Sequence, residues 1–299
     1  MPGGGALPTL GLLAVTAAWG STFFLLKDVL ERLPVSDFLA ARFAVAAAAV
    51  WLLAPRCLAR LDAAQRRRGV LLGVVYGAAQ LLQTVGLQTT AASVSGFLTG
   101  MYVVLTPLLA ALVLRARLSR TVWVAVSVST VGLGVLSLQG LALSSGAALT
   151  LASAALYAVH ILGLGAWSRG SDALGLTLVQ LLTISLLCLV GALPGGLMLP
   201  STRGDWAALL YMALVAGALA LLVQTWAQAH LAPTRAAIIM TMEPAWAAGL
   251  AVAFGGERLG LRLLVGGTLV LGAMLLVELG PARRRTAEAV GGVPHVGPV

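Results

Sequence analysis

Polar side chains that could bind a solute interrupt two otherwise apolar stretches of the chain. They are Gln80, Gln83 and Thr84 in the stretch 69–89, and Gln224, Thr225 and Gln228 around Trp226 in the stretch 206–229. Within each stretch the spacing places the polar residues on one face of a helix. Polar groups are costly in hydrocarbon, so such faces point to a protein interior or a water-filled path. The two faces predict a shared cavity, although hydrogen bonding between helices without any ligand is an equally compatible interpretation.

Glu243 is an acidic residue well inside an apolar stretch, whereas the other acids fall in loops, tails or near the ends of stretches. It is a candidate proton carrier or partner for a cationic substrate; the alternative is a protonated acid bonded to a neighbouring helix. The adjacent Pro244 removes a helix hydrogen bond. Pro107 lies at a similar depth in an earlier stretch, so we expect both helices to be kinked near the same level.

His160 is the histidine that lies inside an apolar stretch, and its imidazole could take up and release protons near neutral pH, which makes it a candidate for proton coupling. A lone histidine in such a place is more often a satisfied hydrogen-bond partner. Four aromatic residues could line the cavity and stack on a substrate, or could simply pack in the core. These are Trp19, Tyr102, Tyr157 and Trp246. Arg42, near the start of its stretch, is expected to extend toward the lipid headgroups rather than to contact substrate.

The elements that must position these residues are apolar helices. Of 299 residues, 60% are hydrophobic and 10% are charged, against about a quarter charged in soluble domains. A helix that crosses a bilayer needs roughly 20 apolar residues. Ten segments meet this condition: 7–27, 38–54, 69–89, 92–114, 121–139, 146–166, 174–193, 206–229, 234–254 and 261–279. They lack the alternating pattern of a membrane β-barrel, so we predict an all-α integral membrane protein.

The basic residues predict the orientation of these ten segments. With the N-terminus inside, the inner loops and tail hold thirteen basic residues, which are Arg56, Arg60, Arg66, Arg67, Arg68, Arg115, Arg117, Arg120, Arg169, Arg235, Arg283, Arg284 and Arg285. The outer loops hold five, which are Lys27, Arg32, Arg203, Arg258 and Arg262. Cytoplasmic loops carry such an excess, so both termini are expected in the cytoplasm. The net charge of +9 therefore reflects topology and not a nucleic-acid site.

An internal repeat divides the chain into two halves. An offset of 141 residues aligns Gln83-Thr84 with Gln224-Thr225 and Arg117-Leu118 with Arg258-Leu259. Each half would contain five helices. Because a repeat with an odd number of membrane crossings leaves the next repeat starting on the other side, the two halves must be inverted relative to each other, as in many secondary transporters. The expected units are 1–139 and 146–279, followed by a disordered cytoplasmic tail at 280–299.

Three stretches resemble the EamA-type drug/metabolite transporter superfamily. They are AAWGSTFFLLKDVLERLPVSDFLAARF, AASVSGFLTGMYVVLTPLLA and APTRAAIIMTMEPAWAAGLAVAFGGERLG, and the likeness runs from about Pro8 to Glu278. The resemblance implies a ten-helix carrier of two inverted repeats that moves small metabolites across the inner membrane, often outward. One departure is Ala116, which stands where the family commonly has the acidic residue that Glu257 supplies in the second half.

Other functional classes fit the sequence less well. No stretch matches a phosphate-binding glycine loop, which disfavours an ATP-driven pump. An embedded enzyme would need clustered carboxylates, metal ligands or an activated nucleophile. A scaffold or receptor that does not transport would leave the intramembrane glutamines without a purpose. We therefore predict a secondary transporter for a small organic solute, with no cofactor, no metal and no disulfide between Cys57 and Cys188; substrate identity and oligomeric state stay open.

Overall fold

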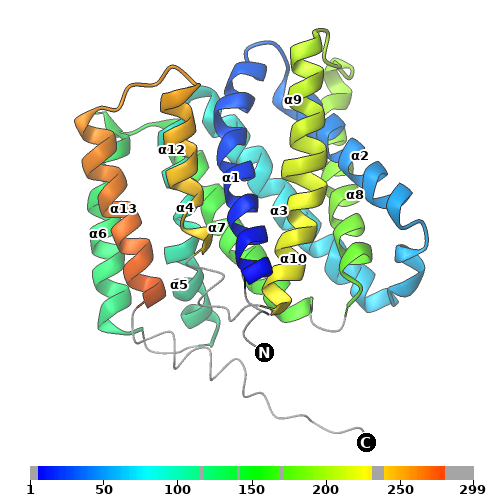
Figure 1. Cartoon of the computed structure of the whole chain (residues 1–299), viewed down its shortest axis with the longest axis horizontal. Coiled ribbons are helices and arrows are strands. Elements are labelled where there is room, and N and C mark those ends of the chain that lie inside the picture. The colour runs from blue at the N-terminus through cyan, green and yellow to red at the C-terminus, as the bar shows by residue number, and fades with distance from the viewer. Residues whose placement is uncertain (1–5, 115–117, 140–141, 169–170, 231–238, 280–299) are drawn as a thin grey trace, which may run out of the picture.

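The chain folds almost entirely into helices. The computed structural model describes residues 6–114, 118–139, 142–168, 171–230 and 239–279 (Figure 1). The first half contains α1 (Ala6–Val29), α2 (Val35–Leu53), η1 (Cys57–Arg60), α3 (Ala63–Thr89), α4 (Ala92–Gly100), α5 (Tyr102–Leu114) and α6 (Arg120–Ser137). The second contains α7 (Ser145–Trp167), α8 (Ala173–Ala192), η2 (Leu193–Gly195), α9 (Arg203–Ala213), η3 (Leu214–Leu219), α10 (Ala220–His230), α12 (Glu243–Ala253) and α13 (Leu261–Leu279). Two short antiparallel strands of two residues each, β1 (Leu138–Gln139) and β2 (Ala142–Leu143), lie between the halves.

Within the described residues, seven helical segments are long and apolar enough to cross a membrane, and α6 and α13 are shorter apolar helices. Nine of the ten predicted segments coincide with these helices. The predicted segment 234–254 is described only from Ile239 onward, and its helical part there is chiefly α12. Most predicted ends agree within three residues, but α3 begins at Ala63 and not at 69. The predicted start was too far along the chain because the first two turns carry Arg66, Arg67 and Arg68, whereas the helix begins at its polar cap.

That cap is a reciprocal pair of hydrogen bonds at the start of α3. The Gln65 backbone N–H donates to Asp62 Oδ1 over 2.7 Å, and the Asp62 N–H donates to Gln65 Oε1 over 3.0 Å. A capping box of this kind satisfies two backbone donors that a helix start leaves open. The charged residues after Asp62 can therefore be helical although they are not apolar.

Two of the spans are interrupted at positions related by the repeat offset. The helix of 92–114 breaks at Met101, between α4 and α5, and a turn at Thr241–Met242 precedes α12. The prediction that both helices bend near the same level agrees with these breaks. The breaks do not lie at the prolines, however, but precede them in the chain. Pro107 lies inside α5, and Pro244 occupies the first turn of α12, where a missing N–H costs no helix bond.

A third irregularity lies in the span that begins at Arg203. Between α9 and α10 the backbone forms a π-helix, η3, which inserts a wider turn into an otherwise continuous rod. Such wider turns are rare and often occur at functional sites. No signal in the sequence predicted it.

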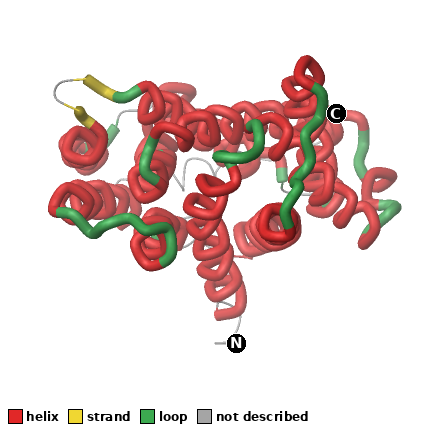
Figure 2. The backbone as a smooth tube through the Cα atoms, turned by 90° about the horizontal axis from the view of Figure 1, so that it is seen from above, coloured by secondary structure: helices red, strands yellow, loops and turns green. Residues whose placement is uncertain are grey.

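The helices lie side by side with the loops at their two ends (Figure 1), and Figure 2 shows the same bundle from above. α3 packs along α7 and α8, α6 along α13, and α1 against α10 and α12. Glycines allow the close crossing of α3 and α7: a Cβ on Gly86 would lie 2.6 Å from the carbonyl oxygen of Gly146. Both cysteines are fully buried, Cys57 in η1 and Cys188 in α8.

Polar contacts tie together the loops that the basic residues assign to the outer face. Arg32 Nη2 lies 2.7 Å from Asp205 Oδ1, and Lys27 Nζ donates to the Thr90 carbonyl over 2.5 Å. The Glu257 carboxylate, from the α12–α13 loop, accepts hydrogen bonds from the backbone N–H of Ala92 and from the Ser93 hydroxyl. A carboxylate of the second half thus caps the first turn of α4, where the helix dipole favours negative charge.

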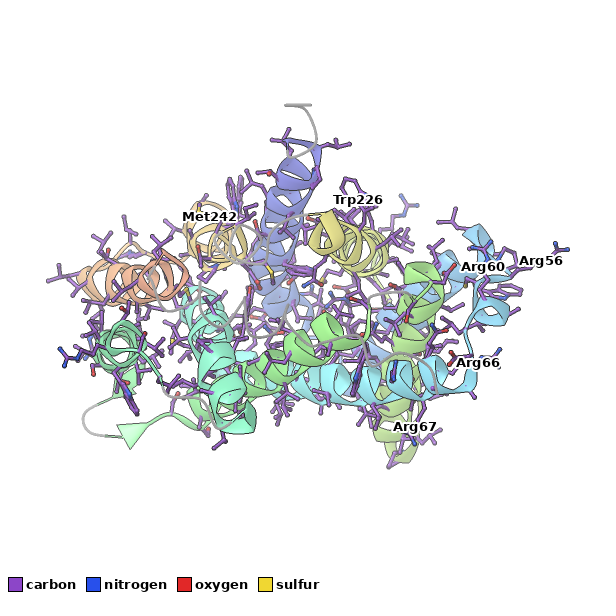
Figure 3. All side chains as sticks on the ribbon, turned by 90° about the horizontal axis from the view of Figure 1, so that it is seen from below. Arg56, Arg60, Arg66, Arg67, Trp226 and Met242 are labelled. Carbon is purple, nitrogen blue, oxygen red and sulfur yellow. The ribbon has the colours of Figure 1, made fainter. Side chains whose placement is uncertain are left out.

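At the opposite end, Arg60 Nη1 lies 3.0 Å from Asp172 Oδ2, and Asp172 caps α8 through the Gly175 N–H. Burial would raise the pKa of Asp172, but these hydrogen bonds lower it below its usual value. Figure 3, viewed from below, shows Arg56 and Arg60 at the α2–α3 connection and Arg66 and Arg67 at the start of α3. Each of these contacts joins loops that the basic residues assign to the same face.

Candidate functional site

A small cavity of about 60 Å³ lies among the helices, with room for a few water molecules. Eight residues predicted from the sequence contribute to its lining: Trp19, Gln80, Gln83, Tyr102, Tyr157, His160, Gln224 and Glu243. They come from α1, α3, α5, α7, α10 and α12, so residues of both halves of the chain meet at one site. Gln83 and Gln224, which the repeat aligns, both line it.

Gln83 holds together one side of the cavity. Its Oε1 accepts a hydrogen bond from the Tyr157 hydroxyl over 2.9 Å, and its Nε2 donates to Thr99 Oγ1 over 2.9 Å. One turn away, Gln80 Nε2 donates to the Tyr76 hydroxyl over 3.3 Å. The glutamine face of α3 is thus connected to α4 and α7 by side chains that also border the cavity.

The carboxyl group of Glu243 lies at the start of α12, buried to 6% exposure. The Tyr102 hydroxyl donates to Glu243 Oε2 over 3.1 Å, and Tyr102 is the first residue of α5. The two residues are 141 positions apart, which is the offset of the internal repeat. Each therefore begins a helix just after the corresponding break, and the two side chains meet inside the cavity.

His160 is buried on α7, and its Nε2 lies 2.8 Å from Gln180 Oε1 of α8. Gln180 Nε2 donates to the Leu176 carbonyl, which leaves its oxygen to accept the histidine N–H. The ring of His160 also lies 4.8 Å from that of Tyr76. The imidazole has a hydrogen-bond partner and faces the cavity at once, so proton coupling through it remains a prediction.

Arg42 contradicts its expected position. Instead of reaching the headgroups it is 4% exposed and lines the cavity, with its guanidinium 5.1 Å from the centre of the Phe43 ring. The expectation was wrong because nearness to the end of an apolar run does not fix depth. α2 begins three residues before the predicted segment and packs against α8 and η3, so Arg42 faces protein.

The region of the π-helix supplies backbone acceptors to two cavity side chains. Arg42 Nε donates to the Met212 carbonyl over 3.1 Å, just before η3, and Trp19 Nε1 donates to the Ala216 carbonyl within η3 over 2.9 Å. A side chain of α1 and one of α2 are thereby fixed against the same irregular stretch of the second half.

Three other predicted residues with described side chains, Thr84, Trp226 and Trp246, do not contribute to the lining. Thr84 is fully buried elsewhere on α3, and Trp246 is 37% exposed on α12. Trp226 is 36% exposed and lies on the outer side of α10 (Figure 3). Gln228 belongs to α10, but its side chain and that of Thr225 lie outside the described residues.

The sequence interpretation missed Arg42, Tyr76 and Thr99, which also line the cavity. Tyr76 precedes Gln80 by one helical turn, so extending the polar face of α3 backward would have found it. Thr99 carried no comparable signal. For a metal site, the described residues offer no group of three His, Cys, Asp or Glu side chains.

Known proteins resemble this chain along nearly its whole length. A transporter of uncharacterised function from Archaeoglobus fulgidus is 29% identical over 273 residues, covering 90% of this chain and 85% of the relative. A solved crystal structure shares the fold with a TM-score of 0.65 at 17% identity, covering 94% of this chain and 99% of the other. The profile of the EamA-like transporter family matches residues 7–138 and 144–279. The chain therefore belongs to the EamA-like transporter family.

Proposed function

We propose that this multi-pass membrane protein is a secondary transporter that exports small organic metabolites, amino-acid-like or drug-like, across the inner membrane by alternating access. The observation that carries the proposal is the buried polar cavity to which both halves contribute. Polar and ionisable groups inside a membrane bundle are costly and usually mark a substrate or ion path. Here Gln80, Gln83, Gln224 and Glu243 gather at one place instead of being scattered over the spans.

The alternating-access part of the proposal includes two inverted five-helix repeats, 1–139 and 146–279, with ten spans in total. The repeat offset relates the break at Met101 to the turn at Met242 and pairs Tyr102 with Glu243. Transporters built from such repeats place the substrate between interrupted helices near the membrane midplane. The position of the Tyr102–Glu243 hydrogen bond beside both interruptions supports that arrangement.

The proposed orientation predicts a labelling pattern for single cysteines. A cysteine at Arg66 should be shielded from a membrane-impermeant maleimide in intact cells, whereas one at Ser145 should react. Both positions are exposed in the structure, so differences in local burial do not explain the contrast. The native cysteines are buried, and the unmodified protein serves as the blank. Reaction at Arg66 and protection at Ser145 would reverse the orientation.

Uptake of labelled solutes into vesicles that contain the pure protein tests transport directly. Gln83→Leu and Gln224→Leu should each reduce uptake strongly while leaving yield and membrane insertion nearly unchanged. Leu has nearly the volume of Gln. At position 83 it removes the hydrogen bonds to Tyr157 and Thr99, and at position 224 it removes a polar side chain from the cavity lining. Gln88→Leu, an exposed change on α3, is the matched control.

Normal transport by both single variants would contradict the polar-cavity assignment. A scaffold, receptor or enzyme would instead give no uptake with the wild-type protein under any gradient. The wild-type measurement and the variant measurement therefore test the function and the site separately.

A further inference from the structure

Arg42 is a buried cation whose bonding is incomplete. It is 4% exposed, yet the hydrogen bond that the structure shows for its side chain is the one from Nε to the Met212 carbonyl. A guanidinium carries five N–H donors and stays protonated in proteins. The structure shows no hydrogen bond for its other donors, and Arg42 lines the cavity.

No carboxylate forms a salt bridge with Arg42 among the described residues. The salt bridges there involve Arg32 and Arg60, not Arg42. Glu243 shares the cavity, but its hydrogen bond is with the Tyr102 hydroxyl. Removing an ion from water is expensive unless an opposite charge or several hydrogen bonds replace the water. One backbone carbonyl and the face of Phe43 meet only part of that need.

The rest of the cavity lining indicates the chemical character of a ligand that could pair with Arg42. Phe23, Leu26, Leu87 and Ile161 contribute apolar surface beside the aromatic rings and the uncharged polar side chains of the cavity. One unpaired cation balances one negative charge, and the planar fork of a guanidinium matches the two oxygens of a carboxylate. An apolar molecule with a single carboxylate satisfies both features of the cavity.

We propose that the transported solute carries a carboxylate and that Arg42 binds it, which makes the substrate a small organic acid or amino acid with an apolar body. This inference rests on the proposed transport function and specifies its substrate class. Arg42 is then the residue that distinguishes carboxylates from their neutral amides.

Thermal unfolding of the purified wild-type protein tests the binding step. Sodium acetate and sodium benzoate should raise the midpoint in a concentration-dependent way, because a ligand that binds the native state stabilises it. Acetamide and benzamide at the same concentration, with sodium chloride added to equal ionic strength, should raise it much less. Equal shifts from acids and amides, or a shift with sodium phosphate and none with the carboxylates, would overturn the proposal.

The variants Arg42→Gln and Arg203→Gln assign the effect to a residue. Arg42→Gln should weaken benzoate binding roughly 10- to 100-fold, the loss expected for hydrogen bonds to a charged group. Arg203 is exposed at the start of α9, so its variant should bind benzoate like the wild type. Unchanged benzoate affinity in Arg42→Gln would exclude Arg42 as the anion site.

Vesicle transport separates this inference from the proposed function. Carboxylate binding lost in Arg42→Gln, together with no transport of any solute by the wild type, would leave the anion site standing and remove the transport function. Transport of neutral or cationic solutes at the wild-type rate by Arg42→Gln would retain the function and reject the carboxylate substrate.

Discussion

Glu243→Gln is expected to abolish solute accumulation driven by a pH gradient while permitting downhill exchange. If transport is coupled to protons, a group in the cavity must bind and release a proton as access alternates. Glu243 is buried there, and its recorded partner is the Tyr102 hydroxyl. Gln has nearly the same shape and can still accept from that hydroxyl, but it cannot titrate. The substitution therefore removes proton exchange with little change in packing.

The measurement compares proton-driven accumulation with counterflow exchange in the same vesicles. Glu31→Gln, an exposed change in the turn after α1, is the control for a general effect of losing an acid. Full gradient-driven accumulation by Glu243→Gln would leave Glu243 a structural acid or a substrate contact. His160 would then be the next group to test, because it also lines the cavity.

Gly86→Ala is expected to cause the largest loss of stability among the single changes considered. The added Cβ would lie 2.6 Å from the Gly146 carbonyl oxygen and 3.1 Å from the Thr150 nitrogen. Both atoms belong to the backbone of α7, so no side-chain rotation can relieve the overlap. Overpacking of this kind costs about 1–3 kcal/mol or more, because α3 and α7 must move apart.

Gly165→Ala on α7 is the matched control, since a Cβ there would meet no atom within 4 Å. It should be neutral or slightly stabilising, because Ala is favoured over Gly in a helix by about 0.5–1 kcal/mol. Folded yield from size-exclusion chromatography and the thermal midpoint in detergent report the difference. The close crossing of α3 and α7 would be ruled out as a stability determinant if the two variants behaved alike.

The sequence predicted the helices well, because a span is defined by length and hydropathy, which are local properties. The 1.5 Å rise per residue makes an apolar run of about 20 residues long enough to cross a membrane whatever it packs against. A polar cap can make a helix begin before its apolar run, as the Asp62 cap does for α3. Tyr102 and Glu243 were predicted separately, and the sequence interpretation did not notice that the repeat offset relates them or that they touch.

The direction in which each side chain faces was harder to predict, since it depends on neighbouring helices. Trp226 and Trp246 were expected at the site, yet each is more than one-third exposed. Arg42 was expected at the headgroups, yet it lies in the cavity because α2 packs against α8 and η3. Polar residues spaced along one helical face, such as Gln80 and Gln83, gave the better guide, because their common direction follows from the helix itself.

The π-helix between α9 and α10 determines the direction in which the side chains of α10 point around the helix axis. Each residue of an α-helix advances the side-chain direction by about 100°, so the wider turn of η3 rotates α10 relative to a regular continuation of α9. Deleting one residue within Leu214–Leu219 would let this stretch close as regular α-helix and leave α10 in nearly its present phase, because the wider turn holds about one extra residue. The same deletion in the regular part of α9 would turn Gln224 away from the cavity by about 100°. The π-helix is therefore the one place in this span where the chain can lose a residue and keep the direction of the side chains that follow.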